Sequence, residues 1–208
     1  SILSIKPYDR AVWFTENFTI IPIVAILVIL YLFKIRFSNL AYALMSVLIY
    51  MHTYGGHYTF ELAPFNWFND MFGFERNMYD RIAHFTVGFY ALPIYEYVQS
   101  RKIIASKWVS ALFALFTIIS IAAVYELFEW QYAVLGDPTA GIEVLGSQGD
   151  IWDAQKDMGL AVLGAFAGAV IIFIINWIYK KNFWQDMKDG FKLEKGDHEL
   201  GEVELERM

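Results

Sequence analysis

Long apolar segments separated by short polar stretches are the main feature of this sequence. Segments free of Asp, Glu, Lys and Arg cover residues 17–33, 37–60, 82–95, 108–125 and 158–179. A helix needs about 20 mainly apolar residues to cross a bilayer, and four of these segments approach or exceed that length. The 82–95 segment is shorter, and it spans only with Asp80, Arg81 and Glu96 at its ends. Charge within a membrane helix marks a candidate functional region.

The pattern predicts an all-α protein, a polytopic transmembrane helix bundle with five membrane helices in one domain over residues 1–181. The expected helices cover residues 18–34, 37–54, 79–99, 106–132 and 151–180. The residues before them mix aromatic and charged side chains, which is typical of an interfacial segment. Residues 182–208 form a polar cytoplasmic tail, in which we expect a short amphipathic turn followed by a solvated end.

Composition restricts the chemistry that the chain can support. Hydrophobic residues make up 57% of it and aromatic residues 18%, with a mean hydropathy of +0.39, which is unlike a soluble domain. The formal net charge of -6 argues against a nucleic-acid partner. With no cysteine, the chain has no disulfide, thiolate nucleophile, iron–sulfur cluster or Cys-ligated zinc. Any bound metal, such as a divalent ion, must have nitrogen and oxygen ligands.

Basic residues predict the orientation in the membrane. Most of them follow the first, third and fifth expected helices: Lys34, Arg36, Arg101, Lys102, Lys107, Lys180, Lys181, Lys188, Lys192, Lys195 and Arg207. Cytoplasmic loops carry an excess of Lys and Arg. We therefore expect the C-terminus in the cytoplasm and residues 55–79 and 134–150 on the outer side of a bacterial cytoplasmic (inner) membrane, facing the periplasm.

Unusual polar residues gather at the outer ends of the expected helices. His52 ends the second helix, Asp80 and His84 begin the third, Glu126 and Glu129 end the fourth, and Asp150, Asp153 and Asp157 begin the fifth. Spacings of three, four and seven place the members of each group on one helix face. Several carboxylates at one depth require a positive partner. Arg81, Lys156 or a divalent metal ion supplies it, or else the carboxyls share protons as an acid–base site.

These positions give a set of candidate site residues. Candidate catalytic residues are Asp80, His84, Glu126 and Asp157; candidate metal ligands are His84, Glu126, Asp153 and Asp157, with His52 as an additional ligand; candidate substrate-binding residues are His57, Tyr58, Arg81 and Glu129. Structural alternatives exist for several residues. Helix capping accounts equally well for Asp80 and Asp150, and Glu129 can pair with Lys156 at the surface. Glu96 lies at the opposite end, where we expect it to pair with Arg101.

Two glycines in the last expected helix favour close helix packing. Gly164 and Gly168 form a GxxxG motif within GLAVLGAFAGA. Small residues at this spacing let two membrane helices approach closely, so this segment needs no cofactor to explain it.

Several motifs together resemble a known family. They are PYDRAVWFTEN (7–17), GGHYTFELAP (55–64), RNMYDRIAHFTVGF (76–89), YELFEW (125–130) and LGSQGDIWDAQKDM (145–158). They are similar to the YjdF-like inner-membrane proteins of bacteria, a family of unknown function. The resemblance implies a further helix before Ser1, making six. A DR..H motif, a glutamate ending the next helix and acids opening a glycine-rich helix also resemble, more remotely, the VanZ-like membrane proteins.

Three functions are compatible with the sequence, and whether the protein is an enzyme stays open. The first is a metal-dependent enzyme or binding protein for a lipid or lipid-linked envelope molecule. The second is a proton-coupled transporter or channel, although the inner halves of the helices are almost purely apolar, with Asn176 as an exception. The third is a structural subunit or assembly factor of a membrane complex. Membrane lipids are the expected partners, and a homo-oligomer or larger complex is compatible with the small-residue helix.

Overall fold

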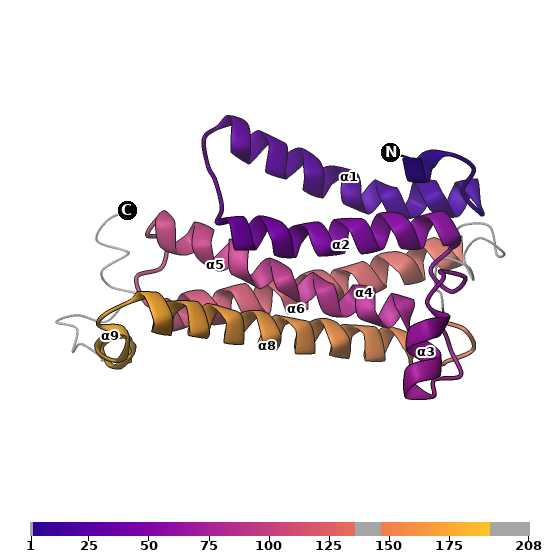
Figure 1. Ribbon diagram of the computed structural model, residues 1–208. Helices are drawn as coiled ribbons and strands as arrows, with labels where there is room; N and C mark the ends of the chain where they lie inside the picture. Colours follow the sequence, from indigo (N-terminus) through magenta and orange to yellow (C-terminus); the bar gives the residue numbers. More distant parts are fainter. Residues whose placement is uncertain (1, 136–146, 192–208) are drawn as a thin grey trace.

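The computed structural model describes residues 2–135 and 147–191, and these form helices joined by short connections. The elements in chain order are η1 (Ile2–Ser4), α1 (Arg10–Leu32), α2 (Asn39–Tyr58), α3 (Asn66–Phe72), α4 (Tyr79–Val87), η2 (Gly88–Tyr90), α5 (Ala91–Ser100), α6 (Lys107–Leu135), α8 (Asp153–Tyr179) and α9 (Phe183–Asp189). The long helices run side by side in alternating directions, and α3 and α9 lie at opposite ends (Figure 1). The all-α prediction is confirmed.

Within the described ranges, three helices are long and apolar enough to cross a membrane, namely α1, α6 and α8. Large apolar side chains such as Phe18, Phe116 and Phe166 are exposed on their outer faces. In water such faces would favour association or aggregation, whereas in a bilayer they contact lipid. The structure therefore describes a helical membrane protein.

The first long helix begins earlier than the hydropathy pattern indicates. α1 starts at Arg10 rather than at residue 18, because Asp9 caps it: Asp9 Oδ1 accepts a hydrogen bond from the Val12 amide at 2.9 Å. Residues 10–17 of the polar stretch thus belong to α1, and η1 precedes them; the interfacial position expected for the stretch stays a prediction. Val12, Glu16 and Ile20, spaced by four residues, are all buried on one face.

The third expected helix is interrupted by a turn of 3₁₀ helix. Residues 79–100 divide into α4, η2 and α5, and η2 begins at Gly88. Pro93 lies in the first turn of α5 and has no amide hydrogen to bond one turn back, which favours a break here. A side chain at Gly88 would place its Cβ only 1.9 Å from the Gly164 carbonyl carbon.

The backbones of α4–η2 and α8 are therefore in direct contact along Gly88, Gly164 and Gly168. A Cβ on Gly164 would lie 1.9 Å from the Phe85 oxygen, and one on Gly168 would lie 2.8 Å from the Gly88 oxygen. The close-packing role expected for the GxxxG motif is confirmed. We call this contact the glycine seam.

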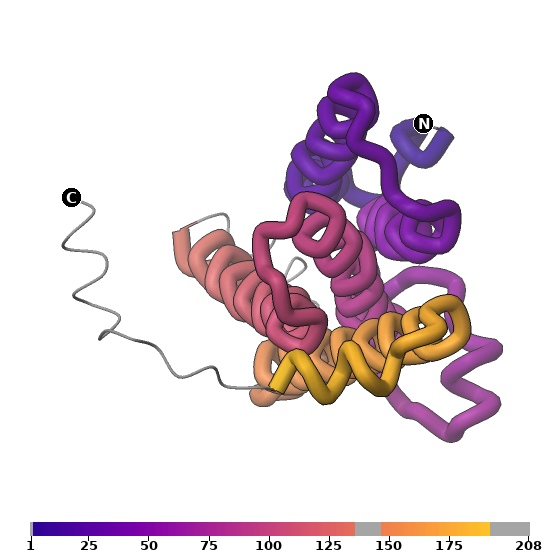
Figure 2. Tube along the Cα trace, turned by 90° about the vertical axis from the view of Figure 1, so that its left-hand side faces the viewer, coloured from indigo at the N-terminus to yellow at the C-terminus, as the bar shows by residue number. Residues whose placement is uncertain are grey.

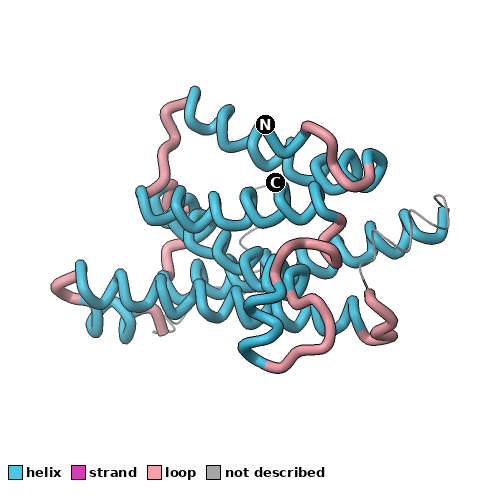
Figure 3. The backbone as a smooth tube through the Cα atoms, turned by 45° about the vertical axis from the view of Figure 1, so that its right-hand side comes forward, coloured by secondary structure: helices cyan, strands magenta, loops and turns pink. Residues whose placement is uncertain are grey.

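The remaining long helices complete the bundle. In the end-on view of Figure 2, α1 lies at the periphery beside α2, and α6 lies across the bundle from α2. Figure 3 shows the loops gathered at the two ends of the long helices. The apolar core fills the middle of the bundle with Met45, Leu92, Ala114, Ile118 and Ala165.

The two ends of the bundle differ in what holds them. At one end α9 is attached by an ion pair between Lys107 and Asp186, and its Phe183 is buried. The expected amphipathic turn corresponds to α9, whereas residues 192–208 lie outside the described residues. Glu96 also lies at this end, where it accepts hydrogen bonds from the Ser38 amide (2.9 Å) and hydroxyl (2.5 Å). The expected pairing of Glu96 with Arg101 is therefore wrong. Glu96 binds Ser38, the N-cap residue of α2, instead.

Candidate functional site

Polar residues from five helices meet at the opposite end, which we call the polar end. α1, α4 and α8 begin there, and α2 and α6 end there. The buried acidic and imidazole side chains at this end are Glu16, His52, Asp80, His84, Glu126, Glu129, Asp153 and Asp157. Antiparallel neighbours place the start of one helix beside the end of the next. Residues far apart in the sequence thereby reach the same depth.

His84 lies at the centre of the carboxylates. Its Nε2 is 3.6 Å from Asp80 Oδ1, one turn earlier on α4, and its Nδ1 is 3.5 Å from Glu126 Oε1 on α6. Two groups of ligand atoms share this imidazole, and within each group all atoms lie within 4.8 Å of one another. One group is Asp80, His84 and Asp157; the other is His84, Glu126 and Glu129.

Two carboxylate oxygens in these groups, Glu126 Oε1 and Asp157 Oδ1, are buried and accept no hydrogen bond from the residues that the structure describes. Each has only a longer ion-pair contact, with His84 Nδ1 at 3.5 Å and with Arg81 Nη1 at 3.6 Å, respectively. Buried polar atoms are normally satisfied, and an exception points to an absent ion, water or ligand. These two atoms therefore mark where a positively charged ligand would be most stabilising.

The arginines neutralise a different part of the polar end. Arg81 Nη2 donates to Asp153 Oδ1 at 2.6 Å and to Asp150 Oδ2 at 3.0 Å, and Arg76 Nη1 donates to the same Asp153 oxygen at 2.6 Å. Asp153, a candidate metal ligand from its spacing, thus lies between two guanidinium groups and belongs to neither group of ligand atoms. Arg81 Nη1 reaches Asp157 only at 3.6 Å, so it links the arginine side to the His84 side.

Lys156 binds Asp150 rather than Glu129. Lys156 Nζ donates to Asp150 Oδ2 at 2.6 Å. This bond and one from the Trp152 amide hold the pKa of the Asp150 carboxyl below its ordinary value. Glu129 is buried and faces His84, so the surface pairing expected for it with Lys156 is wrong.

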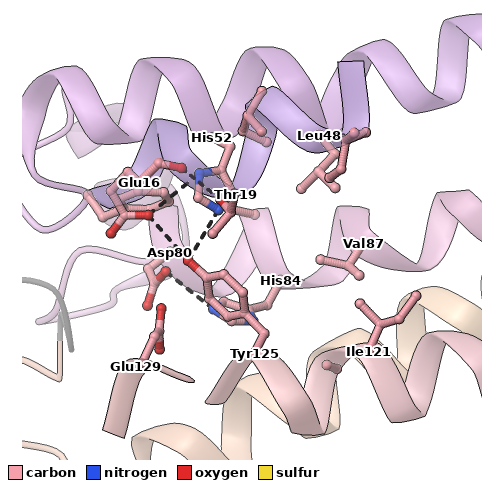
Figure 4. Close-up of a pocket in the computed structure, with 15 residues that line it drawn as sticks. Glu16, Thr19, Leu48, His52, Asp80, His84, Val87, Ile121, Tyr125 and Glu129 are labelled. Atoms are coloured by element: carbon pink, nitrogen blue, oxygen red, sulfur yellow. Dashed lines mark hydrogen bonds and ion pairs between the residues drawn. The ribbon is translucent and has the colours of Figure 1, made fainter. Parts of the chain in front are cut away.

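A second polar group adjoins the first. It contains His52, the additional metal ligand expected from the sequence, together with Glu16 and Tyr125, which the sequence analysis did not single out. The Tyr125 hydroxyl donates to Glu16 Oε2 at 3.2 Å and lies 3.3 Å from His52 Nε2 (Figure 4). His52 Nδ1 in turn is 3.6 Å from Glu16 Oε2. The Tyr125 ring contacts both imidazoles, with centroids 5.9 Å from that of His52 and 5.8 Å from that of His84.

Glu16 reaches this position because α2 has a glycine opposite it. A Cβ on Gly56 would lie 2.9 Å from Glu16 Cβ. The signal for Glu16 in the sequence is its spacing of four from Val12 and from Ile20, which places a carboxylate on an otherwise apolar face. Reading the first seventeen residues as interfacial concealed that periodicity.

The two polar groups border one small cavity of about 90 Å³. Its polar wall includes Glu16, His52, Asp80, His84 and Glu129, and its opposite wall is apolar, as Figure 4 shows for Leu48, Val87 and Ile121. This volume can hold an ion with a few water molecules. We call it the polar cavity.

His57 and Tyr58 do not line this cavity. His57 Nδ1 lies 2.9 Å from the Leu3 carbonyl oxygen, which ties α2 to the N-terminal segment. The Tyr58 ring packs against Tyr54 at 4.9 Å between centroids. Asp80 is also not the helix cap that the structural alternative suggested, because α4 has Met78 at its N-cap position and no side-chain cap bond.

The fold and the buried polar end define a multi-pass helical membrane protein with an acid–imidazole cluster. The chain belongs to the family described as predicted membrane protein (DUF2238), whose profile matches residues 1–178.

A curated relative agrees with this assignment. The chain is 29% identical to the inner membrane protein YjdF of Escherichia coli (strain K12) over 174 residues, which are 81% of this chain and 80% of that protein. No solved structure matches the chain. The resemblance to YjdF-like proteins is thus confirmed, and it supplies a membrane class without a reaction.

Proposed function

We propose that the chain is a protein of the bacterial inner membrane that binds a divalent metal ion at the polar end and uses it on a lipid or lipid-linked envelope molecule. The observation that carries this proposal is the pair of ligand groups that share His84, together with the two buried oxygens that accept no hydrogen bond. In this topology α1, α2, the α4–α5 unit, α6 and α8 span the membrane, the C-terminus is cytoplasmic and the polar end faces the periplasm.

The ligand set favours a first-row transition ion such as Mn²⁺ or Zn²⁺. Opposite ligands of an ion with bonds of about 2.1 Å are about 4.2 Å apart. Atoms within 4.8 Å of one another therefore need only small side-chain rotations to bind one ion. Imidazole with carboxylates suits Mn²⁺ and Zn²⁺ better than it suits Mg²⁺ or Ca²⁺. We propose Asp80, His84 and Asp157 as the ligands of this ion, because their ligand atoms all lie within 4.8 Å of one another. Glu126 and Glu129 form the alternative group, and Glu126 faces the other imidazole nitrogen of His84.

Charge balance supports a cation over a purely structural network. The arginine side already has its own carboxylates in Asp150 and Asp153. The buried acids around His84 and Tyr125 exceed the positive charge available to them, which is costly in a low-dielectric site. A divalent ion held by these residues would remove that cost and would supply Lewis acidity beside the cavity. Glu129, which lines the cavity, would be placed to transfer protons there.

A proton-coupled transporter or channel is less well supported. A path across the membrane needs polar groups at both ends and between them. In the described part of the chain the middle of the bundle is filled by Met45, Leu92 and Ile118, and the buried Tyr95–Asn176 hydrogen bond at the other end is separated from the polar cavity by this core.

Metal content of the purified full chain tests the proposal. After incubation with Mn²⁺ or Zn²⁺ and desalting, we expect roughly one ion per chain by elemental analysis. His84→Ala and Asp157→Asn should lower the affinity for the ion at least about tenfold. Glu96→Gln, which changes a carboxylate at the opposite end, should bind as the original chain does. Absence of binding, or equal binding by His84→Ala, would overturn the proposal.

A further inference from the structure

A long apolar groove runs along the outside of the bundle between α1 and α6. Its volume is about 720 Å³, and its walls include Phe18 and Pro22 on α1 and Phe116, Thr117, Val124 and Phe128 on α6. Phe18, Phe116 and Val124 are exposed, and they belong to two of the three helices that are apolar and long enough to span a membrane. The groove therefore opens toward the bilayer rather than toward water.

The groove and the polar cavity share a wall. Thr19, Ile121 and Tyr125 line both of them. On the cavity side, the Tyr125 hydroxyl donates to Glu16. The groove thus adjoins the acid–imidazole cluster at the level of Tyr125, and from there it continues along α6 to Phe113 over an apolar surface. An occupant with a polar head and an apolar tail matches this sequence of surfaces.

The length of the groove and the nature of its surfaces favour a lipid chain as the occupant. From Phe113 to Phe128 the groove follows α6 for about 22 Å at 1.5 Å per residue. The groove is open along one side, and its apolar surface is continuous with the wall of the polar cavity, which favours a molecule with a polar head and an apolar tail. A single extended hydrocarbon chain fits. The groove runs along α6, so a hydrocarbon chain within it lies parallel to the bundle axis. The groove is longer than the roughly 15 Å of hydrocarbon in one leaflet.

We propose that the α1–α6 groove binds an acyl chain of an outer-leaflet phospholipid, with the headgroup at the Glu16–Tyr125 end beside the polar cavity. This inference rests on the proposed function, since it gives the lateral route by which a lipid reaches the metal site. Pro22, whose ring leaves one backbone carbonyl of α1 without its helical partner, lies in the groove wall. Figure 1 shows that α1 lies farther from α2 at its C-terminal end than at its N-terminal end.

Photolabelling in proteoliposomes tests the groove. The probe is a phosphatidylethanolamine with a diazirine near the end of one acyl chain, and labelled peptides are mapped by mass spectrometry. Because the headgroup lies at the Glu16–Tyr125 end, we expect residues 113–117 to be labelled several-fold more than the exposed surface of α8 around Ile174 and Ile178. Ser120→Trp and Thr117→Trp, which fill the groove, should lower this labelling at least about fivefold. Val24→Trp, on α1 outside the groove, should not.

The outcomes separate this inference from the proposed function. Equal labelling of all exposed helices indicates ordinary annular lipid and overturns the inference. A dimer in the same membranes that Ser120→Trp dissociates also overturns it, because a second copy of the chain would then be the occupant. Metal content is measured on the same samples and also reports folding of the Trp variants. Lost labelling selectivity with metal retained refutes the groove alone; selective labelling without any metal refutes the metal site alone.

Discussion

The two long sides of this bundle are built in opposite ways. Along the glycine seam, backbone meets backbone, and Gly88 leaves no room for even a methyl group against α8. On the other side, bulky residues such as Phe18 and Phe116 line the open α1–α6 groove. The polar cavity lies between these two sides. We propose a division of roles in which the seam fixes α4 and α8, the helices that carry candidate metal ligands, and the groove leaves a route by which a lipid can approach them.

The largest effect is expected from breaking the seam. Gly88→Ala and Gly164→Ala each put a Cβ 1.9 Å from backbone atoms of the opposing helix, and no side-chain rotation relieves such a contact. Overpacking a core typically costs about 1–3 kcal/mol and more when backbone must move, so we expect a loss of about 3 kcal/mol or more in the free energy of unfolding. Thermal unfolding in detergent, followed by circular dichroism, measures it.

Gly159→Ala is the matched control for the seam, because no atom of the described residues lies within 4 Å of the Cβ that it would add on α8. It should leave the stability unchanged or raise it slightly, since alanine favours helix. Equal losses for Gly159→Ala and Gly164→Ala would mean that the seam is not a close contact.

A smaller effect is expected from the wall shared by the groove and the cavity. Tyr125→Phe keeps the ring but removes the hydroxyl that serves Glu16 and His52. Leaving a buried acceptor unsatisfied costs about 1–3 kcal/mol. We therefore expect a loss of about 1–2 kcal/mol in the free energy of unfolding by thermal denaturation, with lipid labelling of the groove retained.

Tyr132→Phe provides the comparison on the same helix. The Tyr132 hydroxyl makes no hydrogen bond within the described part of the chain, and the ring contacts Phe128 in both forms. Its stability should not change. Loss of groove labelling in Tyr125→Phe would contradict the division of roles, because the hydroxyl faces the cavity and the ring forms the groove wall.

The sequence was most informative where one physical rule dominates. Apolar segments of bilayer length predicted the all-α membrane class, and the i, i+4 spacing of Asp80 and His84 predicted their shared face, because helix geometry is local. The GxxxG spacing predicted close packing in the same way, although it did not name Gly88 as the partner.

Relations between helices could not be obtained from spacing along one helix. Asp153 and Asp157 share a face of α8, yet the first meets Arg76 and Arg81 and the second approaches His84. The rotation of α8 against α4, which the seam sets, decides between these neighbours. Glu16 was not predicted as a site residue for a different reason. The first turns of α1 are polar, so the hydropathy pattern placed the start of the helix after Glu16. A cap at Asp9 and the repeat Val12, Glu16, Ile20 were the available signals.

The smallest effect is expected from Asp150, at the exposed edge of the side that carries the glycine seam. Lys156 and the Trp152 amide bind the Asp150 carboxylate there. These bonds lower the pKa of Asp150 in the folded protein, so they contribute stability above the unfolded-state pKa of about 3.9, and that contribution is lost as the pH falls through the lower folded pKa. Comparing melting temperatures of the original chain and Asp150→Asn between pH 7 and pH 3 isolates this part of the acid destabilisation. The difference between the two melting temperatures should be small at neutral pH and should vanish at the acid end.

Asp70→Asn, which removes an exposed carboxylate on α3, is the control. Its melting temperature should change with pH in the same way as that of the original chain. A difference between Asp150→Asn and the original chain that grew toward low pH would contradict this prediction. It would mean that the Asp150 carboxyl has a raised pKa and stabilises the fold when protonated, and not through its bond to Lys156.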